Sequence, residues 1–312
     1  MHKTGFDPGV AVVDAINIVR RHPWRMLGWG LLMYLPMLVV MLALVPMFVE
    51  MAQLEANGGG DPSPASAILV QAASNLGQLA QLAIIVPAIA ALAFMVWQRP
   101  RAKKTWLGMR YGMDELRVLV LVIAYYFGVF LVMFVAIVAI GLISVPLAMV
   151  SKPLGILVGV LGGLAAFAGF VWVGIRAVLI LPASVDSETF AFVEGWKASK
   201  GRFWPLFAVG LLSFLALVAF SILAVVILGI IVLVVALPLG FMSGGDWGTA
   251  NTALAFGLGI PAAILGFLLL SFLQAVSVVM YAVPWYSVWA QMTRAGVLAP
   301  AEVVPPATEI EA

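Results

Sequence analysis

Long apolar runs separated by short polar segments account for most of this chain. A bilayer core is crossed by about 20 helical residues, and six of the runs reach that length. They lie at about residues 24–49, 67–97, 116–150, 153–181, 203–242 and 252–292. The pattern predicts an all-α polytopic membrane protein with six transmembrane helices.

Two of the runs are longer than one perpendicular span. The run at 116–150 has about 35 residues, so its helix should tilt or protrude from the bilayer. The run at 203–242 is too short for two spans and a loop, yet much longer than one span. Either it forms one long helix or it breaks near Gly229 or Pro238, and the sequence leaves both possibilities open.

A short amphipathic segment precedes the first run. Asp7 can accept hydrogen bonds from the free N–H groups at a helix start, and Pro8 suits the first helical position. One face carries Val12, Ile16 and Val19, and the other carries Asp14, Asn17 and Arg21. This pattern is typical of a helix that lies in the membrane interface, and it ends at Pro23. Similar short helices are predicted around residues 105–113 and after Ser187, a second N-cap candidate.

The chain also matches itself at a shift of 180 residues. Trp204 then falls on Trp24, Gly210 on Gly30, and Lys200 on Arg20. A weaker match at half that shift indicates a period of about 90 residues. We therefore expect one membrane domain, residues 1–295, made of three repeats of a cytoplasmic interfacial helix plus a transmembrane hairpin, at about 7–97, 98–185 and 186–295. The tail at 296–312 has three prolines, three glutamates and no basic residue, and it is expected to be disordered.

Composition excludes a water-soluble domain. Of the 312 residues, 64% are hydrophobic and only 10% are charged, whereas soluble domains carry roughly 25% charged residues. The formal net charge of +2 gives no support for a nucleic-acid partner. The chain has no cysteine, which excludes disulfides and thiolate metal sites.

The basic residues are unevenly distributed. Fourteen of the sixteen lie in the N-terminal segment, in the links at 98–117 and 183–202, or just after the last run. Lys152 lies on the other side, and Arg176 lies within a run. By the positive-inside bias, both termini and both links are expected to be cytoplasmic. The N-terminus shows no cleavage pattern and is expected to be retained.

No group of residues resembles a catalytic centre. The histidines are His2 and His22, and the carboxylates lie in the predicted links and outer loops. No glycine-rich phosphate loop with its lysine is present. Metal-assisted hydrolysis needs several convergent ligands, so we expect no enzymatic activity, no metal and no cofactor.

Polar residues gather in the first half of the second run. Those that follow one another at helical spacing are Gln71, Ser74, Asn75, Gln78 and Gln81. Such an intramembrane polar stripe either makes inter-helix hydrogen bonds or lines a hydrated cavity that opens outward.

Arg176 is the one ionised residue predicted inside a run. An arginine at membrane depth costs about 2.5–3.5 kcal/mol, so it either snorkels to the headgroups or meets an acceptor. No acidic residue lies within a run, which leaves an amide, backbone carbonyls, a link carboxylate or a lipid phosphate. Guanidinium binds phosphate through two parallel hydrogen bonds. We predict that Arg176 faces the bundle interior and forms an anionic-headgroup site with Lys200, Arg202 and Gln274.

One stretch resembles a known family. It has an arginine and an aliphatic segment ending in Leu-Pro at 176–182, then Gly-Trp-Lys-Ala-Ser-Lys-Gly-Arg-Phe-Trp-Pro-Leu-Phe at 195–207. This resembles the glycerophosphoryl diester phosphodiesterase membrane-domain family and related uncharacterised six-span proteins. The resemblance implies a six-span fold in a bacterial inner membrane. The phosphodiesterase activity that names the family belongs to a separate soluble domain with acidic and histidine metal ligands, so we do not expect it here.

Two functional hypotheses follow. The first is a non-enzymatic inner-membrane protein that binds anionic lipid headgroups, or a membrane or cytosolic protein partner, in envelope maintenance. The second is a transporter or flippase for an amphipathic, lipid-like solute. Gln71, Asn75 and Gln78 distinguish them, because a transporter would place them on a wide cavity and a scaffold would bury them against helices.

Overall fold

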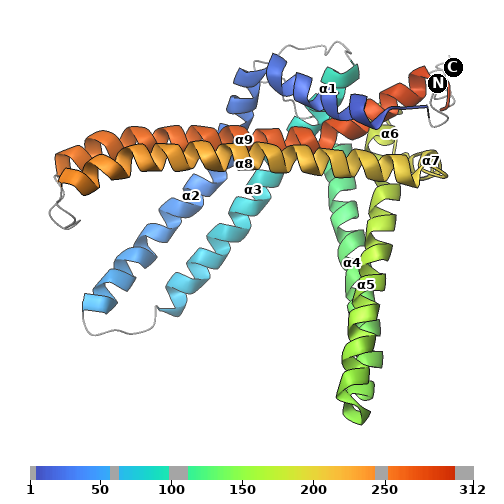
Figure 1. Ribbon diagram of the computed structural model, residues 1–312, viewed down its shortest axis with the longest axis horizontal. Coiled ribbons are helices and arrows are strands. Elements are labelled where there is room, and N and C mark those ends of the chain that lie inside the picture. Colours follow the sequence, from blue (N-terminus) through green and yellow to red (C-terminus); the bar gives the residue numbers. More distant parts are fainter. Residues whose placement is uncertain (1–4, 57–62, 98–111, 243–251, 299–312) are drawn as a thin grey trace, which may run out of the picture.

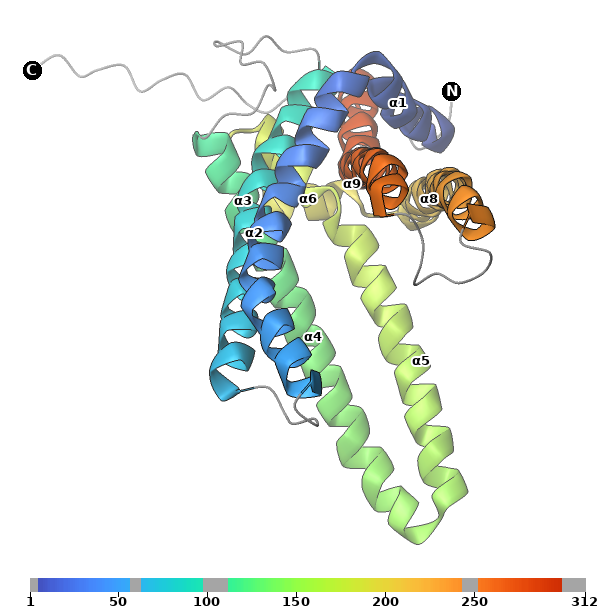
Figure 2. The same ribbon diagram turned by 90° about the vertical axis from the view of Figure 1, so that its left-hand side faces the viewer.

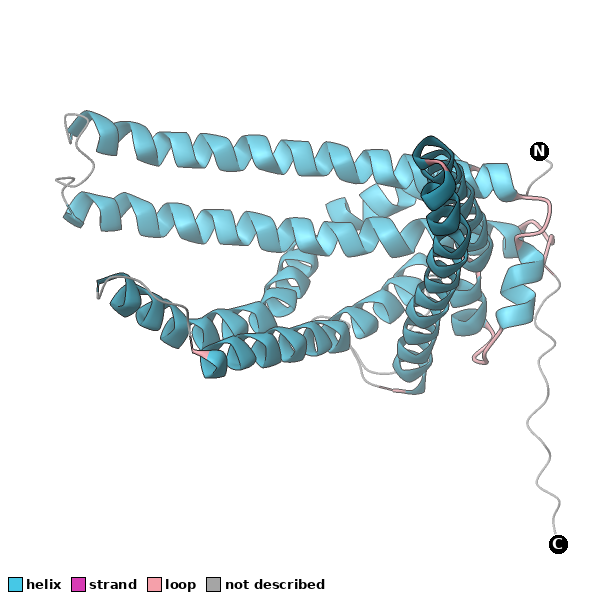
Figure 3. Ribbon diagram, turned by 90° about the horizontal axis from the view of Figure 1, so that it is seen from below, coloured by secondary structure: helices cyan, strands magenta, loops and turns pink. Residues whose placement is uncertain are grey.

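The computed structural model describes residues 5–56, 63–97, 112–242 and 252–298, and every regular element in this part of the chain is a helix (Figures 1 and 3). The helices are α1 (Pro8–Arg21), α2 (Pro23–Ala56), α3 (Pro64–Trp97), α4 (Met113–Val150), α5 (Lys152–Ala177), α6 (Ile180–Asp186), α7 (Phe192–Ala198), α8 (Phe203–Met242) and α9 (Thr252–Arg294). Among the described residues, six segments are long and apolar enough to cross a membrane, one of them made of α5 and α6 together. The prediction of an all-α protein with six span-length helices is confirmed.

Three helical hairpins leave a common base (Figures 1 and 2). They are α2–α3, α4–α5 and α8–α9, and the two helices of each pair pack together. In Figure 1 the α8–α9 hairpin runs across the view, α4–α5 runs down it, and α2–α3 lies between these directions. The short helices α1, α6 and α7 lie at the base, so the chain returns there between hairpins.

The order of short helices and hairpins matches the predicted repeat only in part. Helix α1 precedes the first hairpin, and α6 and α7 precede the third. The short helix predicted around 105–113 lies almost wholly outside the described residues, and α4 already begins at Met113. The threefold repeat and the domain limits therefore stay predictions. Of the tail, residues 296–298 are described, and Leu298 packs against the core.

Helix α9 is the centre of the fold. It contacts α1, α2, α3, α6 and α8. Its buried Val279 and Tyr286 belong to the same core cluster as Trp29 and Met33 of α2 and Leu92 of α3. Helices α4 and α8 are much less buried than α9. Only 0% and 6% of their most apolar stretches are buried inside the protein, against 39% for α9. Apolar surface of this extent, left uncovered by protein, indicates contact with lipid.

Helix α1 begins as its sequence predicts, with the Asp7 carboxylate accepting a hydrogen bond from the N–H of Gly9 at 2.7 Å. Its polar face packs partly against α9. The hydroxyl of Ser287 donates to Asp14 Oδ2 at 2.5 Å, and Gln291 Nε2 donates to Ser287 Oγ at 3.2 Å. Polar contacts between distant parts of the chain thus hold α1 on α9.

The second N-cap prediction, Ser187, is wrong. Ser187 follows the last residue of α6, and its hydroxyl donates to the carbonyl of Ala183 at 2.9 Å. Helix α7 begins only at Phe192, and Ser184 Oγ accepts the N–H of Ala191 at 2.9 Å. Helix α6 continues to Asp186, beyond the apolar run at 153–181, because its residues are buried at the base of the bundle. Because of this burial, Ser187 lies at the end of α6, and the next helix begins later than the local sequence predicts.

The apolar run at 203–242 forms one continuous helix, α8. A side chain at Gly229 would meet nothing within 4 Å, so no packing contact interrupts the helix at that glycine. Helix α9 likewise continues through Pro261 and Pro284. Membrane helices tolerate proline because neighbouring groups and local adjustments satisfy the backbone groups that it leaves unpaired.

Candidate functional site

The guanidinium of Arg176 lies against two indole rings that also contact each other. Its Cζ is 4.8 Å from the centroid of the Trp196 ring and 5.2 Å from that of Trp172. Trp172 lies one turn earlier on α5, and Trp196 comes from α7. The two rings are 6.1 Å apart and meet edge to face at 84°. Such cation–π contacts stabilise a cation by about 0.5–2 kcal/mol each, so the charge is held without a carboxylate.

Ser199 fixes the orientation of this guanidinium. Arg176 Nε donates to Ser199 Oγ at 3.4 Å, and Ser199 Oγ donates to the carbonyl of Trp196 at 2.7 Å. Within the described part of the chain, the two terminal nitrogens of Arg176 donate no hydrogen bond. These nitrogens form the fork that binds carboxylate or phosphate through two parallel bonds. Arg176 is thus oriented by Ser199 and the two indoles, and its terminal nitrogens bind no described residue.

The turn between α7 and α8, which follows Ser199, carries two basic residues. The N–H of Arg202 donates to the carbonyl of Ser199 at 3.1 Å, which closes this turn. Gly201 has a φ of 75°, a conformation that glycine adopts without strain. Lys200 is exposed. The structure therefore places Arg176 next to the turn that carries Lys200 and Arg202.

Two further predictions concern this site: that Arg176 faces the bundle interior, and that Gln274 lies beside it. Arg176 lies between α5 and α7 at the base, instead of facing the interior between the hairpins. Gln274 lies apart from it. Helix α9 approaches α5 near Trp285, since a Cβ on Gly210 would be 3.5 Å from Trp285 and 3.7 Å from Ile175. Gln274 is about 16 Å of helical rise from Trp285 along α9.

The polar stripe of α3 lies on its surface. Gln71, Asn75 and Gln78 are exposed, whereas Ser74 and Gln81 are half-buried. Gln71 Nε2 donates to Asn75 Oδ1 at 3.0 Å, so these two side chains pair along their own helix. The three exposed residues are neither buried against other helices nor part of the groove described next. Their position supports neither the scaffold nor the transporter over the other.

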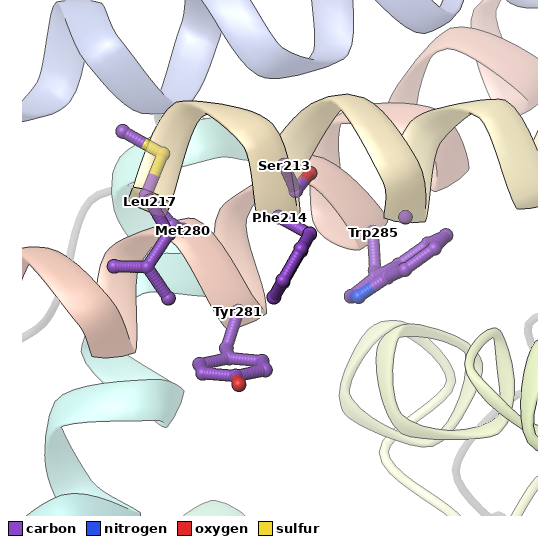
Figure 4. Close-up of a pocket in the computed structure, with 7 residues that line it drawn as sticks. Ser213, Phe214, Leu217, Met280, Tyr281 and Trp285 are labelled. Carbon is purple, nitrogen blue, oxygen red and sulfur yellow. The ribbon is translucent and has the colours of Figure 1, made fainter. Parts of the chain in front are cut away.

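An apolar groove of about 120 Å³ between α8 and α9 was not predicted (Figure 4). It is lined by Gly210, Ser213, Phe214, Leu217, Met280, Tyr281 and Trp285. These residue types are ordinary in apolar runs, so the sequence contained no signal for it. The role of Trp172 was also missed, although its spacing of four residues from Arg176 places both on one helix face.

Titratable groups elsewhere are dispersed. Among the described residues, no three His, Asp or Glu side chains come together as metal ligands would. Burial, followed by the charges of Arg25 and Arg21, lowers the pKa of His22. Glu115, expected in a link, is instead buried in the first turn of α4. In the part of the chain that the structure describes, Arg176 is thus not accompanied by a cluster of metal-ligating side chains.

Comparisons with protein-family models, with curated proteins and with solved structures find no match to this chain. The resemblance to the glycerophosphoryl diester phosphodiesterase membrane-domain family rests on residues 176–182 and 195–207 alone, and it stays a prediction.

Proposed function

We propose that this chain is a non-enzymatic, multi-pass membrane protein that binds the anionic headgroup of a phospholipid at Arg176, in support of envelope maintenance. Its six apolar helices are consistent with an integral membrane protein. The observation that carries the proposal is the Arg176 guanidinium, which contacts two indole rings and donates through Nε to Ser199, while its terminal nitrogens donate to no described residue. A lipid phosphate at the membrane interface is the acceptor that this geometry suits best.

The surrounding charge supports an anionic ligand. Lys197, Lys200 and Arg202 lie within one short stretch that passes Trp196 and Ser199. Each Lys or Arg close to an anionic membrane surface contributes about 1 kcal/mol of attraction. Neutral lipid gains nothing from this cluster, so the proposed site should select lipids by headgroup charge.

Replacing Arg176 tests the headgroup proposal. Arg176→Gln should lower the amount of anionic phospholipid that co-purifies in mild detergent at least tenfold, because the loss of even one hydrogen bond to a charged group, about 1.5 kcal/mol, has that effect. Arg176→Lys should recover only part of it, since lysine keeps the charge but lacks the fork. Mass spectrometry of extracted lipids measures both.

Lys152→Gln is the matched control, because Lys152 begins α5 at the far end of the α4–α5 hairpin. It removes the same charge without touching the site, and lipid retention should not change. Unchanged retention in Arg176→Gln would show that Arg176 only snorkels and that the headgroup site does not exist.

We further propose that the base of the bundle faces the cytoplasm of a bacterial inner membrane. In the described part of the chain, basic residues including Arg20, Arg117, Lys197 and Arg294 lie at the base ends of their helices, whereas Lys152 lies at a hairpin tip. Cytoplasmic segments carry the excess of Lys and Arg.

Reporter fusions test this orientation. Fusions after Lys104 and Ser199 should report the cytoplasm, and fusions after Pro62 and Gly245 should report the outer side. The reason is the positive-inside bias of the segments that carry the fusions. A reversed result at any of the four positions contradicts the proposed topology.

The exposed stripe on α3 does not favour the transporter or flippase hypothesis. A transporter needs a hydrated cavity at the membrane midplane. Lipid binding therefore rests on the Arg176 geometry and not on the stripe, and the family resemblance is a further proposal that rests on sequence alone.

A further inference from the structure

The groove between α8 and α9 lies next to the Arg176 site. A Cβ on Gly210, which lines the groove, would be 3.7 Å from Ile175 Cδ1 and 3.5 Å from Trp285. Ile175 directly precedes Arg176 on α5. Figure 4 shows Trp285 at the end of the groove that α5 approaches. The cationic site and the apolar groove therefore adjoin consecutive residues of α5.

The groove is apolar inside and open at its rim. Met280 is only 1% exposed, while Phe214 and Tyr281 are 58% and 68% exposed. The one hydroxyl at depth, that of Ser213, donates to the carbonyl of Val209 at 2.8 Å within its own helix. Apart from the Trp285 indole N–H and the Tyr281 hydroxyl, the described lining therefore offers a ligand mainly aromatic and aliphatic surface, which suits a hydrocarbon chain.

We propose that this groove holds an acyl chain of the same anionic phospholipid whose headgroup Arg176 binds, an inference that rests on the proposed function. Charge determines which lipid binds. The cationic site selects an anionic headgroup, and the apolar groove holds the acyl chain of that lipid. A diacyl anionic phospholipid has both parts in one molecule.

The dimensions fit this occupant. From Arg202, at the start of α8, to Gly210 is about 12 Å of helical rise, and from Gly210 to Leu217 about 10 Å. One leaflet, from its headgroup region to the bilayer midplane, is about 20–22 Å deep. A lipid with its phosphate at the α7–α8 turn therefore has its chain at the depth of the groove.

An acyl chain gains no hydrophobic free energy when it leaves the surrounding lipid for the protein. Binding of the acyl chain must therefore be stabilised by close packing in the groove. Its contribution comes from dispersion contacts with the groove wall. Filling the groove should therefore lower lipid retention by a few-fold, less than loss of the headgroup contacts does.

Gly210→Leu tests the inference. A Cβ there makes only ordinary contacts, so the variant should fold and its side chain should occupy the groove. The purified full-length protein is exchanged with dioleoyl phosphatidylglycerol, and bound lipid is measured by native mass spectrometry. Gly210→Leu should retain roughly threefold less of this lipid than the unsubstituted protein. Gly229→Leu, the matched change at an open position of α8, should retain it fully.

Two further measurements complete the test. Phe214→Ala removes an exposed groove wall that the fold does not need, and it should also lower retention, which covers the case that Gly210→Leu misfolds. Glycerol 3-phosphate, which has a phosphate but no chain, should fail to displace the lipid at equal concentration. Dioleoyl phosphatidylcholine, with the same chains and a neutral headgroup, should bind weakly.

The outcomes separate the two proposals. If Arg176→Gln loses the lipid while Gly210→Leu and Phe214→Ala keep it, the headgroup site stands and the acyl groove is refuted. Displacement by glycerol 3-phosphate as readily as by lipid also refutes the groove. If Arg176→Gln keeps the lipid, the proposed function fails, and the groove inference fails with it.

Discussion

Gly30→Ala is expected to separate α2 from α9 and to destabilise the protein by about 3 kcal/mol or more, the upper end of the range for overpacking. A Cβ on Gly30 would lie 1.7 Å from the carbonyl oxygen of Ser271 and 2.4 Å from its carbonyl carbon. Both are backbone atoms of α9, which cannot move aside as a side chain can. Small residues let membrane helices approach this closely. Thermal unfolding of the purified protein in mild detergent, followed by circular dichroism, measures the loss.

The displacement of α2 should also disturb the packing of the core, because Trp29 and Met33 on the same helix are fully buried in it. Gly128→Ala is the control: it lies on α4, and its Cβ would meet nothing within 4 Å. That variant should unfold at the same temperature as the unsubstituted protein or slightly higher, since alanine favours a helix over glycine. Equal unfolding temperatures for Gly30→Ala and Gly128→Ala would contradict the close crossing of α2 and α9.

Gly195→Ala is expected to displace α7 and thereby to abolish the Arg176 site. A Cβ on Gly195 would lie 2.5 Å from Ile180 Cα, 2.7 Å from Ile180 N and 2.8 Å from the carbonyl oxygen of Leu179. All three are backbone atoms, so α7 must move as a unit. Trp196 and Ser199, which hold the Arg176 guanidinium, move with it. Retention of anionic phospholipid should therefore fall about as far as in Arg176→Gln, at least tenfold.

The six long helices do not depend on this contact, so Gly195→Ala should still insert into the membrane and keep its helical circular dichroism. Gly163→Ala is the control, because its Cβ would meet nothing within 4 Å. Full lipid retention in Gly195→Ala would mean that the placement of α7 does not govern the site, and the headgroup proposal would lose its structural basis.

The sequence determines the helices of this protein because their causes are local. An apolar run of sufficient length favours a helix in lipid, where every backbone group must be paired within its own segment. The cap at Asp7 is equally local, since donor and acceptor lie two residues apart. That Arg176 needs a polar or aromatic partner was also accessible from the sequence, because charge inside an apolar run is rare and costly.

Only the tertiary structure decided which faces of these helices meet. Asp14 bonds to Ser287, 273 positions away, and the groove joins residues of α8 and α9 that no local pattern relates. Ser187 caps the C-terminus of α6 instead of starting α7, and it is Trp285 of α9, about 16 Å of helical rise from Gln274, that lies near Ile175 of α5. Helix formation depends on neighbours within a few residues, whereas helix contacts depend on side chains that the chain brings together only after the helices exist.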